Sequence, residues 1–193
     1  MTDKTNILGV ILSGGESQRF GEPKAFALYD GEPFYQHAVN ALTPHVNELV
    51  IVSHDALKDR FSKQTSVQLI GDVEPYIGKG PLSGLYASMK QFEYEWYFVL
   101  ACDMPYFDAV TAGRIAQRIK GGVMGITPRA EGRIHPLSAI YHHTTFPHLV
   151  RQLESGSYRM REWIGRFPAQ TVEGLDEKCF KNVNDQQEYQ KLQ

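Results

Sequence analysis

The sequence is poor in cysteine and contains no long apolar run. Its two cysteines, Cys102 and Cys179, form no disulfide framework and no Cys-x-x-Cys metal pair, which favours a reducing compartment. No stretch approaches the length of a membrane-spanning helix. The first six residues lack the charged and then apolar layout of a signal peptide, and Asp3 argues against one. We therefore expect a cytoplasmic protein with no membrane partner.

An excess of positive charge is also missing. The formal net charge is −2, which excludes the electrostatic footprint of a general nucleic-acid binder. A small anionic ligand is still allowed, because a few local cations suffice to bind it. The 193 residues, with 42% hydrophobic and 22% charged side chains, are typical of one soluble globular domain. We expect a single domain over residues 1–193 and a monomer.

Several catalytic signatures are absent as well. The seven histidines show no ligand spacing with cysteines or carboxylates, so a transition-metal site is not expected. No Ser–His–Asp or Cys–His order stands out, and neither cysteine has neighbours that would lower its pKa. The chemistry of this chain is therefore not expected to use a covalent nucleophile.

Apolar runs alternate with segments of helical periodicity along most of the chain. The expected strands are 7–12, 49–52, 67–70, 96–102, 123–127, 136–141 and 169–172. The expected helices are 34 to about 44, 82–90, 108–119, 145–153, 159–164 and a last one from 185. This alternation predicts an α/β fold of three αβα layers, with a mostly parallel, Rossmann-like sheet covered by helices on both faces.

A glycine-containing loop follows the first predicted strand. Gly14 and Gly15 free the backbone so that successive N–H groups can turn toward one anion. Arg19 and Lys24 add two positive charges near the same loop, which favours phosphate binding. The spacing is neither the Walker pattern nor the dinucleotide Gly-x-Gly-x-x-Gly pattern. The alternative is that the two glycines only make a sharp turn between a strand and a helix.

Two aspartates follow other predicted strands. Asp103 comes directly after seven apolar residues, where its oxygens could hold a hard cation such as Mg2+. Alternatively it caps the following turn, since Asp-x-Pro opens turns. Asp72 could accept hydrogen bonds from a base or ribose, or be an ordinary loop residue. Because ligands bind beyond the carboxyl ends of parallel strands, we expect the glycine loop, Asp72 and Asp103 to converge on one crevice.

Further polar residues have roles that the sequence leaves open. His135 could contact an acceptor substrate or anchor a turn. Residues 78–84 could form a second backbone cradle at a helix N-terminus or a plain turn. Arg159 and Arg161 could bind an anion or form a solvated face. In the stretch 182–185, Asn184 or Asp185 could cap the last helix, and the amides could face a ligand.

Several of these stretches together resemble one family. Residues 12–24, Leu-Ser-Gly-Gly-Glu-Ser-Gln-Arg-Phe-Gly-Glu-Pro-Lys, are similar to the Leu-Ala-Gly-Gly-x-Ser-x-Arg-Met-Gly-x-x-Lys opening of nucleotidyltransferases with the GT-A-like fold. Later stretches look like the molybdenum cofactor guanylyltransferase (MobA) family, in the family's order and over nearly the whole chain. These stretches are Asp72 with 80–84, 102–105, 135–137 and 182–184.

The resemblance implies a role for each matching residue. The nucleotide-binding residues would be Leu12, Ser13, Gly14, Gly15, Lys24, Ser53, Asp72 and Asp103. Lys24, Arg19 and Asp103 would be catalytic, with Asp103 also holding Mg2+, and Asn182, Asn184 and His135 would lie on the acceptor side. Three positions depart from the family: Ser13 replaces Ala, Phe20 replaces Met, and Ser53 stands where some members have Asn. The last departure leaves one base contact open.

The resemblance also implies a reaction. It is the Mg2+-dependent transfer of GMP from GTP to the terminal phosphate of Mo-molybdopterin, with release of pyrophosphate. Partners would be GTP, molybdopterin and other proteins of molybdenum-cofactor biosynthesis. The alternatives are a cytidylyltransferase on the same cofactor, a nucleotidyltransferase acting on a sugar phosphate or isoprenoid precursor, and a non-catalytic nucleotide-binding module. The presence of both Lys24 and Asp103 disfavours the last of these.

Overall fold

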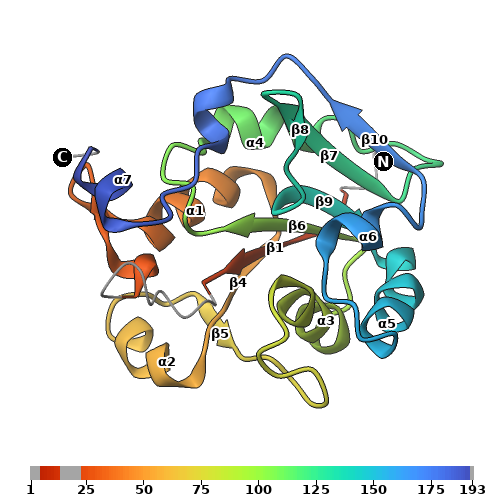
Figure 1. The fold of residues 1–193 in the computed structure, drawn as a ribbon, viewed down its shortest axis with the longest axis horizontal. Helices are drawn as coiled ribbons and strands as arrows, with labels where there is room; N and C mark the ends of the chain where they lie inside the picture. Colours follow the sequence, from red (N-terminus) through yellow and green to blue (C-terminus); the bar gives the residue numbers. More distant parts are fainter. Residues whose placement is uncertain (1–4, 14–22, 192–193) are drawn as a thin grey trace.

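A computed structural model describes residues 5–13 and 23–191 of the chain. In this part an eight-stranded sheet runs in the order β10-β7-β9-β6-β1-β4-β5, with β8 paired to β7 (Figure 1). The strands of this sheet are β1 (Ile7–Leu12), β4 (Glu48–Val52), β5 (Gln68–Ile70), β6 (Trp96–Ala101), β7 (Gly125–Ala130), β8 (Arg133–Ile134), β9 (Ser138–His142) and β10 (Ala169–Val172). A separate two-stranded ribbon pairs β2 (Leu28–Tyr29) with β3 (Glu32–Pro33).

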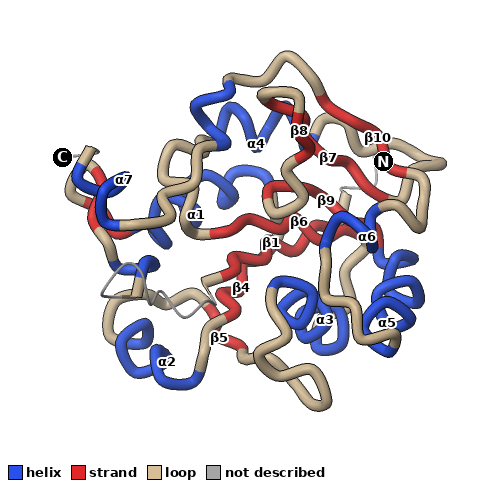
Figure 2. Tube along the Cα trace, viewed as in Figure 1, coloured by secondary structure: helices blue, strands red, loops and turns tan. Residues whose placement is uncertain are grey.

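Helices connect most of these strands (Figure 2). The α-helices are α1 (Phe34–Leu42), α2 (Asp55–Ser62), α3 (Pro81–Gln91), α4 (Ala109–Ala116), α5 (Phe146–Glu154), α6 (Met160–Ile164) and α7 (Gln186–Gln190). The short 3-10 helices are η1 (Lys24–Phe26), η2 (Thr43–His45), η3 (His143–Thr145) and η4 (Glu177–Phe180). Among the described residues, no helix is long and apolar enough to cross a membrane.

The three-layer α/β architecture is confirmed. All six residues of β1 are buried, because β4 and β6 flank the strand and apolar side chains cover both of its faces. Ile7 and Ile11 join the core cluster that contains residues of α1 and α4. Leu8, Val10 and Leu12 point the other way, into the cluster that contains residues of α3, α5 and α6. This alternation follows from the two-residue period of a strand.

The sheet is mostly parallel, as expected, with one reversal among its long strands. β1 pairs in parallel with β4 and β6, and β4 with β5, whereas β9 runs antiparallel to both β6 and β7. Only the residues 131–137, which include the short strand β8, connect β7 to β9. A parallel neighbour needs a crossover of a dozen or more residues, so this connection turns the chain back.

The helix α2 and the β2–β3 ribbon were missing from the sequence-based expectation, as were the short strand β8 and the 3-10 helices. The helix α2 has only Leu57 and Phe61 as large apolar residues, and its N-cap is the His54 ring, which accepts from the Ala56 N–H at 3.2 Å. The β2–β3 ribbon is two residues long on each side. The expected helix 108–119 also ends earlier, at Ala116. Helix α2 was missed because its apolar periodicity is weak and histidine is an unusual N-cap residue.

Candidate functional site

The carboxyl ends of four parallel strands lie at one edge of the sheet. Register pairs Leu12 of β1 with Val52 of β4 and Ala101 of β6, and Val52 with Ile70 of β5. Backbone hydrogen bonds continue one residue further: the N–H groups of Ser13, Ser53 and Cys102 donate to the Val52, Ile70 and Leu12 carbonyls at 2.9–3.1 Å. These four strands therefore end at one edge of the sheet, and the crevice expected there between the glycine loop, Asp72 and Asp103 stays a prediction.

Asp103 is the centre of a cluster of polar side chains at this edge. Its Oδ2 lies 3.8 Å from the Lys24 Nζ, and its Oδ1 accepts from the Asn182 Nδ2 at 3.1 Å. Its backbone carbonyl accepts from the Val183 N–H at 2.9 Å. Asn182 is 79 residues away in the sequence. The structure thus brings together three residues that were proposed separately for phosphate, metal and acceptor binding.

The Asp103 carboxyl lies in a poorly solvated position. Its side chain is 22% exposed and that of Lys24 is 18% exposed. Burial raises the pKa of Asp103, and the Lys24 ammonium and the Asn182 amide oppose this rise only in part. The ionised carboxylate is therefore disfavoured by its surroundings, and a further cation beside it would be favourable. A perturbed carboxyl with a specific charged partner is typical of functional sites.

The donor set at this edge fits a hard divalent cation better than a transition metal. Among residues 5–13 and 23–191, no group of three or more His, Cys, Asp or Glu side chains could hold a metal ion. Asp103 offers carboxylate oxygens, and Mg2+ typically takes one or two protein carboxylates and completes its shell with water and phosphate oxygens. The oxygen donors of Asp103 therefore suit a hard cation, and its role as a ligand to Mg2+ stays a prediction.

Asp72 lies beyond β5 and organises its own loop. Its Oδ2 accepts from the Gly78 N–H at 2.9 Å, and its pKa is raised by burial, with this hydrogen bond acting in the opposite direction. The loop leads to Gly80, whose φ of +83° suits glycine, and then to Pro81, the first residue of α3. Among the described residues, no hydrogen bond or ion pair connects Asp72 to the Asp103 cluster.

Leu12, Ser13 and Ser53 lie at the carboxyl ends of β1 and β4, at the same edge of the sheet. The Ser13 hydroxyl donates to the Val52 carbonyl at 2.9 Å, and the Ser53 hydroxyl donates to the His54 carbonyl at 3.2 Å. All three residues are buried. Helix α3 packs closely against Leu12 at Gly84. A Cβ atom added to Gly84 would lie only 2.8 Å from the Leu12 Cδ2, too close for a side chain there. Both serine hydroxyls thus already donate to the backbone and offer a ligand their lone pairs.

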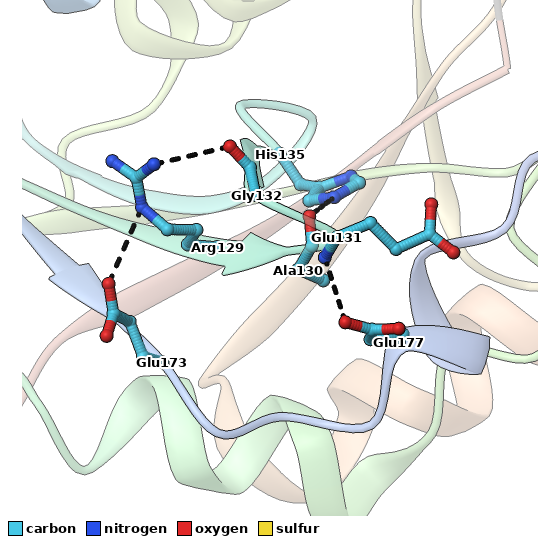
Figure 3. A network of polar contacts seen from close by, with 7 residues as sticks. All are labelled: Arg129, Ala130, Glu131, Gly132, His135, Glu173 and Glu177. Carbon is cyan, nitrogen blue, oxygen red and sulfur yellow. Dashed lines mark hydrogen bonds and ion pairs between the residues drawn. The ribbon is translucent and has the colours of Figure 1, made fainter.

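His135 belongs to a different network, which Figure 3 shows. Its Nε2 lies 3.3 Å from the Ala130 carbonyl, and its ring packs against Phe180 with centroids 4.7 Å apart. Burial lowers the pKa of this histidine, so the neutral ring is favoured. In the described part of the chain, no hydrogen bond or ion pair connects His135 to Asp103, Lys24 or Asn182. The expected strand there starts later, at Ser138.

The β7–β8 turn beside His135 is held by two acidic side chains. The Glu131 N–H donates to the Glu177 Oε1 at 3.2 Å, and Arg129 lies 3.6 Å from Glu173 and donates to the Gly132 carbonyl at 3.3 Å (Figure 3). These contacts anchor the hairpin to Glu173, which follows β10, and to Glu177, the first residue of η4. They give the His135 region a clear structural role, and its acceptor role stays a prediction.

The choice between Asn184 and Asp185 as helix cap is resolved. The Asp185 Oδ1 accepts from the Glu188 N–H at 2.8 Å and caps α7. The Asn184 backbone N–H donates to the Glu188 Oε2 at 2.6 Å. This arrangement differs from a capping box, because the Glu188 carboxylate accepts from the residue before the N-cap and not from the N-cap itself. Asn184 is exposed, and its acceptor role stays a prediction.

Comparison with known proteins places this chain in a family. Residues 9–172 match the model of the MobA-like NTP transferase domain. The chain belongs to this family. A probable molybdenum cofactor guanylyltransferase of Geobacillus sp. is 40% identical over 185 residues, covering 94% of this chain and 95% of the relative. One from Bacillus licheniformis is 35% identical over 188 residues, covering 95% of each.

A solved structure agrees with this assignment at the level of the fold. Molybdopterin-guanine dinucleotide biosynthesis protein A from Archaeoglobus fulgidus superposes with a TM-score of 0.79 at 20% identity, covering 96% of both chains. This MobA-like NTP transferase is therefore a nucleotidyltransferase with the fold expected from its sequence. The match to the family model ends at residue 172, before Asn182 and Val183, which contact Asp103.

Three of the site residues proposed for this MobA-like NTP transferase, Gly14, Gly15 and Arg19, lie outside the described residues. One contributor inside them was missed. Val183 stands between Asn182 and Asn184 and binds the Asp103 carbonyl through its N–H while its side chain is buried. An apolar residue between Asn182 and Asn184 was the available signal that this segment packs against the protein. Its backbone hydrogen bond to Asp103 has no sequence signature.

Proposed function

We propose that this enzyme transfers GMP from GTP to the terminal phosphate of Mo-molybdopterin, forming the molybdopterin guanine dinucleotide cofactor and releasing pyrophosphate. The observation that carries the proposal is the cluster of Lys24, Asp103 and Asn182 at the carboxyl edge of the sheet. In this cluster an ammonium, a carboxylate and an amide lie side by side, which supports a metal-assisted phosphate chemistry. The names of the relatives that are 40% and 35% identical support the choice of substrate.

In the proposed reaction, an oxygen of the acceptor phosphate attacks the α-phosphorus of GTP. The bond from that phosphorus to the bridging oxygen of the β-phosphate breaks, and the electron pair leaves with pyrophosphate. The acceptor is already an anion, so no general base is needed. The protein's task is to position two phosphates and stabilise the charge between them.

Each residue of the cluster has a part in this proposal. The Lys24 ammonium contacts the phosphates of GTP and stabilises the departing pyrophosphate. Asp103 holds Mg2+, which when bound neutralises charge on the phosphate oxygens. Asn182 donates to Asp103 and so fixes the carboxylate from the acceptor side of the site. Catalysis by preorganised charges requires such fixed neighbours.

The remaining residues are assigned to the two substrates. Leu12, Ser13, Ser53 and Asp72 line the nucleoside part, and Gly14, Gly15 and Arg19 hold the triphosphate. Asn184 and His135 contact molybdopterin together with Asn182. We further propose a cytoplasmic monomer that receives molybdopterin from other proteins of molybdenum-cofactor biosynthesis.

Thermal melts with GTP, CTP, UTP and ATP, each with and without Mg2+, test the choice of nucleotide. A ligand at a hundred times its Kd stabilises a protein by about 2.7 kcal/mol, which for this chain length raises Tm by roughly 5 to 10 °C. We expect this shift with GTP and Mg2+. A matched melt of Asp103→Asn should lose the part of the shift that depends on Mg2+.

The melts also discriminate the alternatives. A shift with CTP and none with GTP would replace the guanylyl assignment with the cytidylyl one. If GTP raised the melting temperature equally with and without Mg2+, and the protein released no pyrophosphate, a non-catalytic binding module would be favoured.

A further inference from the structure

The C-terminal segment 181–190 crosses from the turn that carries Asp103 to the segment that follows Lys24. In Figure 1 the helix α7 lies at the same side of the molecule as the carboxyl ends of β1 and β6. Two separate points of contact fix the segment there. Both lie beyond residue 172, where the match to the family model ends.

The first point of contact is Val183. Its N–H donates to the Asp103 carbonyl at 2.9 Å, and its side chain is 2% exposed in a small cluster with Ala27 and Phe34. Asn182, the neighbour that donates to the Asp103 carboxylate, is itself exposed. Because Val183 holds the adjacent backbone in place, less entropy is lost when the exposed Asn182 side chain is ordered on Asp103.

The second point of contact is Tyr189 of α7. Its hydroxyl oxygen accepts from the Leu28 N–H at 3.0 Å, and its ring packs edge to face on Phe34, with centroids 5.9 Å apart. The Asp185 cap starts α7 at the position that makes this contact. Tyr189 therefore anchors the end of the segment whose beginning touches Asp103.

The residues that Tyr189 contacts are connected to Lys24 by backbone hydrogen bonds. The Ala27 N–H donates to the Lys24 carbonyl at 3.0 Å, and the Phe34 N–H donates to the Ala27 carbonyl at 2.9 Å. Leu28 is four residues beyond Lys24. A single series of contacts therefore joins Tyr189 to Lys24 on one side and to Asp103, through Val183, on the other.

We propose that Tyr189 is a positioning residue, which clamps the C-terminal segment across the site and so fixes the mutual placement of Lys24, Asp103 and Asn182. The proposal rests on the proposed function, because it concerns the geometry of the same reaction. Misplacing catalytic groups by about 1 Å can lower a rate a hundredfold, so a residue that touches no reacting atom can control the rate.

The test compares Tyr189→Ala and Tyr189→Phe with the matched control Tyr94→Ala. Tyr94 is another half-buried tyrosine with a hydroxyl hydrogen bond, to the Glu48 Oε2 at 2.6 Å, and it lies before the amino end of β6. Hydrogen–deuterium exchange of the free protein is measured first. For Tyr189→Ala we expect faster exchange in peptides over 24–34 and 100–106, with peptides over α5 unchanged.

Steady-state kinetics of pyrophosphate release are measured next. We expect kcat to fall roughly 10- to 30-fold in Tyr189→Ala and roughly 2- to 5-fold in Tyr189→Phe, which keeps the ring and loses one hydrogen bond. KM for GTP should stay within about twofold of the parent value, because the clamp acts on placement in the transition state. Tyr94→Ala should keep the parent kcat.

Each outcome decides the proposal. Local exchange changes with a graded loss of kcat support it. Exchange and kcat equal to those of Tyr94→Ala would overturn it, and so would faster exchange throughout the molecule, because that pattern indicates a general loss of stability. If the parent released no pyrophosphate from GTP while Tyr189→Ala loosened only 24–34 and 100–106, the clamp would stand and the proposed function would fail.

Discussion

Replacing Asp103 with asparagine is expected to lower the rate of pyrophosphate release about a thousandfold, since a bound metal contributes several kcal/mol to stabilising charge. Asparagine keeps the shape and can still accept from Asn182, but it lacks the charge that holds a divalent cation. The melting temperature should stay the same or rise. Burial raises the pKa of Asp103, so the ionised form costs stability at neutral pH and an uncharged amide removes that cost.

The combination of lost activity and retained stability separates a functional carboxylate from a structural one. Asp59→Asn is the matched control, because Asp59 is exposed on α2 and should change neither the rate nor the melting temperature. Near-normal turnover in Asp103→Asn would refute the metal-binding role. A large fall in melting temperature would instead favour the alternative that Asp103 is a turn cap.

Replacing Lys24 with methionine should lower kcat/KM for GTP by roughly 100- to 1000-fold, the range for loss of one preorganised charge-stabilising donor. Methionine preserves most of the length of the side chain, so packing changes little. The Lys24 side chain is 18% exposed, and its Nζ lies 3.8 Å from the Asp103 Oδ2 at the carboxyl ends of the strands. Much of the loss should be in kcat, because charge on the leaving pyrophosphate develops in the transition state.

Lys120→Met is the control for this substitution, since Lys120 is exposed and follows α4. Initial rates over a range of GTP concentrations give kcat and KM separately. If Lys24→Met raised KM but left kcat unchanged, Lys24 would be a ground-state binding residue only. If both parameters were normal, its assigned place in the reaction would be wrong.

The layered fold and the edge that carries the site were predictable from local patterns. The buried runs Ile7–Leu12 and Trp96–Ala101 have no polar residue, which is typical of central strands in a sheet covered on both faces. Because these strands are parallel, the residues that directly follow their carboxyl ends lie at the same edge of the sheet. That reasoning placed Asp72 and Asp103 just past the ends of two strands, β5 and β6, without any knowledge of long-range contacts.

Contacts between distant segments were not predictable in the same way. The direction of β9 depends on the short connection from β7, and the strand pattern alone does not report direction. The bond from Asn182 to Asp103 spans 79 residues, and the Tyr189 contact to Leu28 spans 161. No periodicity encodes such pairings. The resemblance to a family supplied the residues, and only the fold showed which of them touch.

A single-turnover experiment with GTP labelled at the α-phosphate tests the central claim most directly. The enzyme is mixed with Mo-molybdopterin and Mg2+, and the products are separated. The proposed function predicts that the label enters the molybdopterin guanine dinucleotide cofactor in an amount equal to the unlabelled pyrophosphate released. Label that stays in GTP, while α-labelled CTP transfers its label to molybdopterin, would contradict it.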